Sequence, residues 1–400
     1  MRDIKRNKFI TVVTEGLRTA ALLCVTGPIM QTFLASLGFS SQFIYINNTL
    51  MQLANVLTIF LCAQWADKGN IVKRTAIVEI PHALLYLCYI PLCLWRSASF
   101  ASFAILTAIC LLQTVCTALH TICYYKLPYY LYSPEDYGSV IAIGGLLASL
   151  MSLGCGAVIT WLTAYFDYSQ LMLVACILSA IFMGLCVALH AKQKIVITDV
   201  PAEPAADKKQ THSVIQLLRY PIFYKMVPAN IFRGFAYGVT GVMATIALDL
   251  GFDTGVATAI VSVQSAALLV GYAAFGFGVN HTTPRFVTLL GCAPFLLIPL
   301  LLIPNPVLFL SVFALIMLGR TMVDNAVPAV LRFAVPVEIA GPYNAWRMLL
   351  HFAGTTIATT VAAFVSAKVL LLLAMIVQLM AGISYFTTKE VGGRSLFKKS

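Results

Sequence analysis

The chain has 400 residues, of which 60% are hydrophobic and 10% are charged, and its 26 Lys and Arg outnumber its 15 Asp and Glu. Because soluble domains carry about 25% charged residues, this composition excludes an ordinary soluble protein and is typical of a helical membrane protein. The net charge of +11 does not indicate a nucleic-acid partner, since the basic residues gather in the tails and in alternate loops.

The first half of the chain contains six apolar runs that are long enough to cross a bilayer. They predict helices at residues 9–37, 42–65, 75–95, 99–125, 138–165 and 170–190, with a loop at residues 126–137. The basic first residues are similar to the start of a signal peptide. However, Glu15 and Arg18 interrupt the apolar run that follows, so a first membrane helix is the better interpretation.

The composition changes at residues 191–219, where Lys, Asp, Glu and Pro replace the apolar runs. We interpret this segment as a flexible linker. Six further runs predict helices at residues 221–248, 254–279, 284–303, 306–331, 341–367 and 368–388. The predicted organisation is an N-terminal half at 1–190, the linker at 191–219 and a C-terminal half at 220–400.

The distribution of Lys and Arg predicts the orientation of the chain. If both termini lie inside, the outer loops contain only Arg96 and Lys368, and all other Lys and Arg of the loops and tails lie inside. By the positive-inside rule, we expect a multi-pass protein of the plasma membrane with both termini and the linker in the cytoplasm.

The eleven cysteines lie in apolar segments, and no two have a CxxC spacing. Cysteine in such a setting is a small apolar residue, so the sequence predicts neither disulfides nor a metal site. We also expect no cofactor.

The two halves are similar to each other in sequence. Leu37-Gly38-Phe39 recurs as Leu250-Gly251-Phe252, and Val25-Thr26-Gly27 is similar to Val239-Thr240-Gly241 if two single-residue gaps are allowed. In the same alignment Arg18 corresponds to Arg233. The pattern predicts a parallel repeat of six helices.

Polar residues recur at helical spacing in several predicted spans, for example Asn48, Gln52 and Asn55. Amides and hydroxyls at such positions also serve as contacts between helices. Arginine is different, because a charge within the bilayer is costly and usually functional. The candidate substrate-binding residues are Arg18, Arg233, Arg320, Arg347, His351, Asn48, Gln52, Gln113 and Asp324.

The segment 63–74, between the second and third runs, resembles the corresponding loop of the major facilitator superfamily. Asp67 and Lys68 match its pattern, while Ala63 and Asn70 replace its two glycines. The resemblance implies an all-α integral membrane protein with twelve transmembrane helices in two six-helix bundles. It also implies gating roles for Asp67, Lys68, Lys73 and Arg74.

The acidic residues within the spans are candidates for coupling transport to an ion gradient. They are Glu15, Glu79 and Asp324. Glu79 and His82 fit an inner gate or a proton site, and an ion pair between Glu79 and Arg74 fits equally well. The fourth-helix arginine that this family often uses for proton coupling is Gln113 here.

These observations favour a secondary transporter that moves a small solute by alternating access. Paired arginines such as Arg18 and Arg233 resemble those of organic-anion transporters in the family, so we expect an anionic solute. The alternative for Arg18 is snorkelling to lipid phosphates. A membrane sensor that binds solute without moving it is the alternative function. An embedded enzyme is disfavoured because the six histidines are scattered and no HExxH occurs.

The expected partners follow from this interpretation. They are a small-molecule solute, the lipid bilayer and a coupling proton or ion. We expect a monomer with no nucleic-acid partner.

Overall fold

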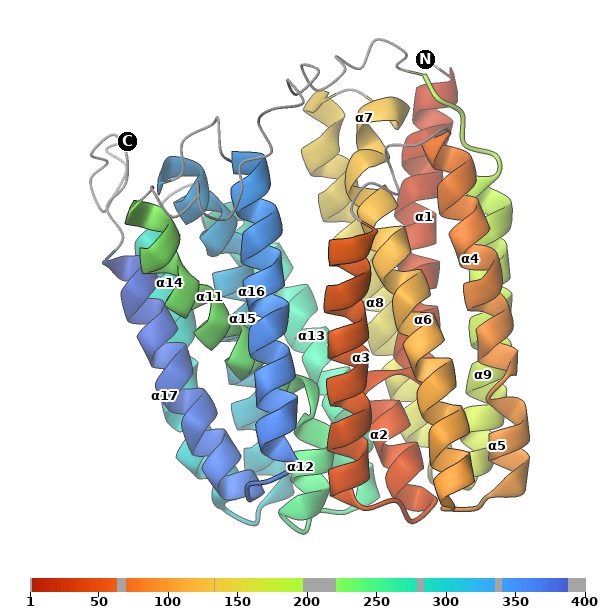
Figure 1. Ribbon diagram of the computed structural model, residues 1–400, viewed down its shortest axis with the longest axis vertical. Coiled ribbons are helices and arrows are strands. Elements are labelled where there is room, and N and C mark those ends of the chain that lie inside the picture. The colour runs from red at the N-terminus through yellow and green to blue at the C-terminus, as the bar shows by residue number, and fades with distance from the viewer. Residues whose placement is uncertain are drawn as a thin grey trace. The chain divides into compact units, whose positions relative to one another are not determined.

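The computed structural model describes residues 2–62, 70–132, 134–196, 221–278, 284–334 and 340–387. Every regular element within these ranges is a helix (Figure 1). Asp67 and Lys68 lie outside the described residues, as does most of the predicted linker.

The chain divides into two compact units. The first unit comprises Met1–Ala202 and Asp253–Ser265, and the second comprises Glu203–Phe252 and Ala266–Ser400. The predicted halves at 1–190 and 220–400 stay a prediction, because one short piece of the second half clusters with the first unit.

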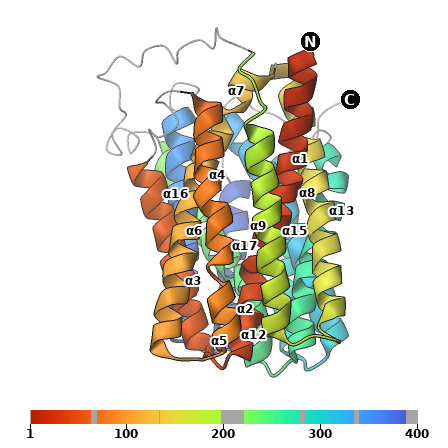
Figure 2. The same cartoon turned by 90° about the vertical axis from the view of Figure 1, so that its right-hand side faces the viewer.

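Within the described residues, the first unit contains nine complete helices. They are α1 (Arg2–Val25), α2 (Gly27–Ser36), α3 (Ser41–Leu61), α4 (Ile71–Leu87), α5 (Ile90–Trp95), α6 (Phe100–Lys126), α7 (Pro128–Leu131), α8 (Pro134–Leu162) and α9 (Tyr168–His190). Helices α8 and α9 pack beside α1, and α4 packs beside α9 (Figure 2). The predicted loop at 126–137 is wrong, because its prolines stand first in α7 and α8, where proline is well tolerated.

The second unit contains the remaining elements, and α13 (Thr254–Gly278) begins in the first unit and ends in the second. Its elements are α11 (Pro221–Gly241), α12 (Met243–Asp249), α14 (Pro284–Cys292), the 3₁₀ helix η2 (Ala293–Leu302), α15 (Pro306–Ala334), α16 (Ala340–Ala362) and α17 (Ala367–Phe386).

The first span of each predicted half is broken within two residues of the segments that the sequence repeat pairs. In the first unit α1 ends at Val25, and α2 starts at Gly27, whose φ of 56° suits glycine. In the second unit α11 and α12 are bent by 59° on either side of Val242. The corresponding breaks support the internal repeat.

Ten helices of the described residues are long and apolar enough to cross a membrane, or eleven if α11 and α12 form one bent span. The helix predicted at 341–367 is present as α16 with 23 residues, but it is not among those apolar spans. Its stripe of Arg347, His351, Thr355 and Thr359 lowers its hydropathy. The exact count of twelve spans therefore stays a prediction.

Three glycines let α11 and α16 approach closely. A Cβ atom on Gly234 would lie 2.0 Å from the carbonyl oxygen of His351, and one on Gly354 would lie 2.2 Å from that of Ile231. Gly238 completes a Gly-x-x-x-Gly pattern on α11, and it packs against the backbone of Thr355. Small residues at this spacing are typical of tightly packed membrane helices. The packing brings His351 to the face of α11 that carries Arg233 and Tyr237.

Asp167, the N-cap of α9, stands just before the apolar span and forms a capping box with Gln170. The Asp167 side chain accepts a hydrogen bond from the Gln170 backbone, and the Gln170 side chain accepts one from the Asp167 backbone. Arg96 lies 3.0 Å from the Asp167 carboxylate. The hydrogen bond from the Gln170 backbone, and then the charge of Arg96, lower the pKa of Asp167 from its ordinary value.

Candidate functional site

A cluster of charged and aromatic side chains lies between α11, α15 and α16 in the second unit. The Tyr237 hydroxyl donates a hydrogen bond of 2.7 Å to Asp324 Oδ1, and Arg233 Nη2 forms an ion pair with the same oxygen. The Arg320 Nε lies 3.8 Å from the other carboxylate oxygen, Oδ2. One carboxylate thus holds a tyrosine and two arginines together.

The ring of Tyr237 lies at the centre of this cluster. The guanidinium carbon of Arg320 is 4.1 Å from the ring centroid, and that of Arg233 is 4.9 Å away. Both distances fall within the range of cation–π interaction. The His351 ring packs edge-on against Tyr237 at 5.2 Å. Arg320 Nη1 also donates to the Thr240 hydroxyl, at 3.1 Å.

The cluster carries an excess of positive charge. Arg233, Arg320 and Asp324 sum to +1, and Arg347 of α16 is near enough to act electrostatically on His351. The Arg233 side chain is only 9% exposed, whereas Arg320 and Asp324 are 25% and 24% exposed. Arg233 therefore anchors the cluster, while Arg320 and Asp324 are accessible from outside the packed core.

In the sequence Asp324 lies four residues after Arg320, about one helical turn, whereas no acidic residue stands at that spacing from Arg233. The structure shows that Asp324 serves both arginines, because α15 packs against α11 at this level. The sequence could not reveal the second pair, since 91 residues separate its members.

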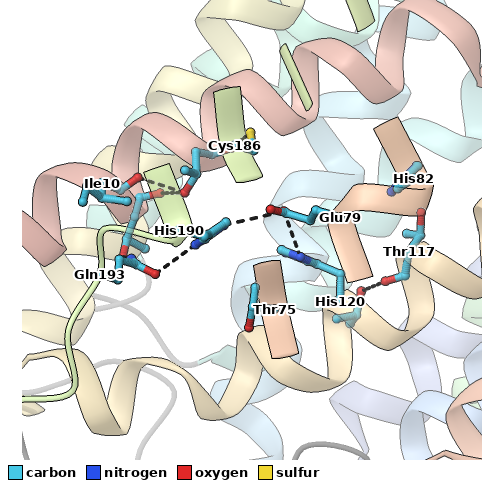
Figure 3. Close-up of polar contacts among 12 residues, drawn as sticks. Ile10, Thr75, Glu79, His82, Thr117, His120, Cys186, His190 and Gln193 are labelled. Atoms are coloured by element: carbon cyan, nitrogen blue, oxygen red, sulfur yellow. Dashed lines mark hydrogen bonds and ion pairs between the residues drawn. The ribbon is translucent and has the colours of Figure 1, made fainter. Parts of the chain in front are cut away.

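A second buried polar cluster lies in the first unit, between α4, α6 and α9 (Figure 3). Glu79 of α4 is fully buried, and its Oε1 lies 3.1 Å from His120 Nδ1 and 3.6 Å from His190 Nε2. His82 is also fully buried, and it lies 3.3 Å from the Tyr86 hydroxyl. Folding therefore gathers histidines that looked scattered in the sequence.

His190 continues this cluster towards the end of α9. Its Nδ1 lies 2.9 Å from Gln193 Oε1, and Gln193 Nε2 donates to the Thr11 hydroxyl at 3.1 Å. Thr11 in turn donates to the carbonyl oxygen of Asn7. A continuous chain of contacts thus joins Glu79 to the first turns of α1 (Figure 3).

The other predicted residues of the first unit do not gather at one place. Gln113 of α6 is buried and accepts a hydrogen bond of 2.7 Å from Tyr89. On α3, Asn48 donates to the carbonyl oxygen of Ile44 and lines a small hollow at the break between α1 and α2, and Gln52 lies one turn further along. Arg18 of α1 acts electrostatically on both Glu79 and His82.

The two units are described separately, so the placement of Arg18 opposite Arg233 stays a prediction. Of the gating residues, Lys73 is exposed and Arg74 half-buried in the first turn of α4. Glu15 lies on α1, one turn before Arg18.

Sequence reasoning missed Tyr237, His120, His190 and Gln193 as members of these clusters. A signal was present for the histidines. Glu79 lies near the start of its span, whereas His120 and His190 lie near the ends of theirs. Successive membrane helices alternate in direction, so these positions reach a similar depth. No comparable signal marks Tyr237. Within the described residues, no group of three His, Cys, Asp or Glu could hold a metal ion.

The chain was compared with curated proteins, with solved structures and with models of protein families. No curated protein matches the chain. Among solved structures, a mutant of the nucleoside transporter NupG has a TM-score of 0.70 at 12% identity, covering 96% of this chain and 99% of its own. The D-xylose-proton symporter has a TM-score of 0.75 at 10% identity, covering 98% and 100%.

A bacterial metal transporter is also similar, with a TM-score of 0.68 at 12% identity over 96% of this chain and 98% of its own. At these identities the likeness shows the fold alone. The family model of the Major Facilitator Superfamily, however, matches residues 19–359. The predicted family is thereby confirmed, and the chain belongs to the Major Facilitator Superfamily, as a multi-pass membrane transporter.

Proposed function

We propose that this protein is a secondary transporter that moves a small organic anion across the plasma membrane by alternating access. The family supports transport rather than catalysis. The cluster of the second unit supports the anion, because the two arginines that lie over Tyr237, Arg233 and Arg320, share the carboxylate of Asp324 and leave a net charge of +1. That excess of positive charge is the observation on which the substrate class rests.

Arg320 is the residue that we assign to solute binding. Its guanidinium stacks on Tyr237, is tied to Thr240, and belongs to a side chain that is one-quarter exposed. A planar guanidinium held in this way can bind a carboxylate or phosphate through two parallel hydrogen bonds. Arg233 has a different role, because its ion pair with Asp324 holds the cluster together.

The solutes named in the similar structures are a nucleoside, D-xylose and a metal, and they do not favour an anion. The cation–π contacts and the net charge of this cluster are the reasons for our choice. A sensor that binds the same anion without moving it is the second candidate, since its binding cluster would be built in the same way.

The test begins with thermal stabilisation of the purified protein by a panel of solutes. Carboxylates and phosphate esters are compared with neutral nucleosides and D-xylose, because a ligand that binds the native state raises its stability. Arg320→Lys keeps the charge but loses the planar fork, and we expect it to weaken anion binding about tenfold or more. Arg96→Gln removes an exposed arginine of the first unit and is the matched control.

Counterflow in proteoliposomes then separates the two candidate functions. A transporter exchanges labelled for unlabelled anion, whereas a sensor binds the anion without exchange. Stabilisation by neutral or cationic solutes alone, or unchanged binding in Arg320→Lys, would refute the anion proposal.

A further inference from the structure

We propose that Glu79, with His120 and His190, forms a proton-binding site in the first unit that is loaded from an aqueous cavity at the start of α4. The solute site proposed above lies in the second unit. The proton site would couple transport to a proton gradient, and this coupling role rests on the proposed function. Proton binding itself does not.

The Glu79 cluster is buried. Glu79 has no exposed surface, and the side chains of His120 and His190 are 2% and 3% exposed. Ionisable side chains within membrane spans are costly, so they are usually retained for function. Neither carboxylate oxygen of Glu79 has a well-aligned hydrogen bond from the described residues. The carboxylate therefore depends on the two imidazoles, or on an added proton.

The directions of the neighbouring hydrogen bonds fix which nitrogen of His190 carries a hydrogen. The Thr11 hydroxyl gives its proton to the Asn7 carbonyl, so it accepts from the amide nitrogen of Gln193. The amide oxygen of Gln193 then faces His190 Nδ1, which must carry a hydrogen.

In a neutral His190 with its hydrogen on Nδ1, the lone pair of Nε2 faces the carboxylate of Glu79. Two lone pairs that face each other in a buried site repel. One added proton removes the conflict, either as an imidazolium or as a carboxylic acid. The pair of Glu79 and His190 thus binds one proton. The separation of 3.6 Å between His190 Nε2 and Glu79 Oε1 is longer than a direct hydrogen bond, so the bound proton can also be released.

A route to water lies beside the cluster. A cavity of about 650 Å³ opens beside the start of α4 and is lined by Asn70, Lys73, Gln193 and Lys194, among others. Lys73 and Lys194 are exposed, so the cavity reaches solvent. Gln193 belongs both to its wall and to the contact with His190. A proton from water in this cavity would pass His190 and convert the Glu79 carboxylate into a carboxylic acid, and on release it would return to water.

Other titratable groups surround the cluster on every packed helix and set its response to pH. On α4 they are His82 and Tyr86, and on α6 Tyr124 stacks on His120. On α9 Cys186 is near Glu79, and on α1 Arg18 and Glu15 contribute opposite charges. Arg18 is the one permanent cation among these groups, so it favours release of the proton.

Infrared difference spectroscopy of the full-length protein, without solute, tests proton binding directly. A change of pH should produce the carbonyl stretch of a buried carboxylic acid. We expect Glu79→Gln to remove this signal and Glu15→Gln, a nearby carboxyl on α1, to retain it. Any other pattern in these two variants overturns the assignment to Glu79.

A second measurement leaves the carboxyl in place, in case Glu79→Gln does not fold. In His190→Gln and His120→Gln the midpoint pH of the carbonyl signal should move by about one unit or more, since a charge partner is lost. Leu178→Ala, at a lipid-facing position of α9, should leave the midpoint unchanged. An unmoved midpoint in both histidine variants overturns the proposal.

Coupling is tested separately in proteoliposomes. Glu79→Gln should abolish accumulation driven by a pH gradient while counterflow exchange continues. Accumulation that persists in Glu79→Gln would overturn the coupling role. If the infrared signal is found but no anion is bound, the solute proposal fails and the proton site stands.

Discussion

Replacing Gly234 with alanine tests whether close packing of α11 on α16 holds the cluster of the second unit together. The added Cβ would lie 2.0 Å from the carbonyl oxygen of His351, whereas real Cβ atoms essentially never approach within 3.0 Å. The obstacle is backbone rather than a flexible side chain, so the two helices must separate locally by about 1 Å.

The loss of stability that Gly234→Ala causes can be estimated from the packing. A gap of about 0.5–1 Å forfeits a quarter to a half of the dispersion energy between facing atoms. Insertion of a methyl group into a well-packed contact typically costs about 1–3 kcal/mol. For a unit of about 200 residues this corresponds to a fall of roughly 2–12 °C in Tm. The contact between Tyr237 and His351 would be disturbed as well.

The assay uses the single cysteine of the second unit. Cys292 is buried beside Gly382, and the other ten cysteines lie in the first unit. Pulsed alkylation at increasing temperature, read at Cys292 by mass spectrometry, reports unfolding of the second unit by itself. Gly184→Ala is the matched control, because its Cβ would meet nothing within 4 Å. The control should be neutral or slightly stabilising, since alanine favours a helix over glycine.

The reasoning would be refuted if Gly234→Ala and Gly184→Ala gave the same midpoint at Cys292. It would also be refuted if Gly234→Ala destabilised only the first unit. A lower midpoint with unaltered binding of the solute would show that the packing stabilises the fold without positioning His351.

Asp324→Asn leaves the buried Arg233 without its counter-ion. We expect the free energy of unfolding to fall by about 1–3 kcal/mol, a range that is already discounted for the partial exposure of Asp324. Asp3→Asn, which removes the acid of an exposed ion pair, is the control and should change the apparent Tm little. Because folding lowers the pKa of Asp167, its ionised carboxylate stabilises the folded state at pH values above the unfolded pKa of about 3.9. That stability is lost as the pH falls through the folded pKa. Asp167→Asn keeps an N-cap residue without the charge, so its apparent Tm should fall less than that of the wild type below about pH 4, and equal falls would contradict this. The predicted orientation can be tested in a Cys88→Ser background, which lacks the exposed cysteine. An impermeant thiol reagent added outside intact cells should label Ala98→Cys but not Gln210→Cys. External labelling of Gln210→Cys would contradict the predicted orientation.

The sequence by itself determined the class of protein and most of its helices. Run length and hydropathy are local properties, and the bilayer selects for them directly, so α3, α6, α9 and α17 begin and end within a few residues of prediction. Run length did not predict the break in the first span of either half, although both breaks lie close to the paired segments Val25-Thr26-Gly27 and Val239-Thr240-Gly241. The loop at 126–137 failed because its prolines, taken as loop residues, stand at helix starts.

Only the tertiary structure decided which polar side chains meet. Periodicity paired Arg320 with Asp324, four residues away, but Arg233 reaches the same carboxylate from another helix. Glu79, His120 and His190 come from three helices, and the angle at which each helix faces its neighbours decides their contact. Those angles depend on side-chain packing, as the glycines of α11 and α16 illustrate. Helices form from local preferences, whereas the two clusters depend on contacts between residues that are distant in the chain.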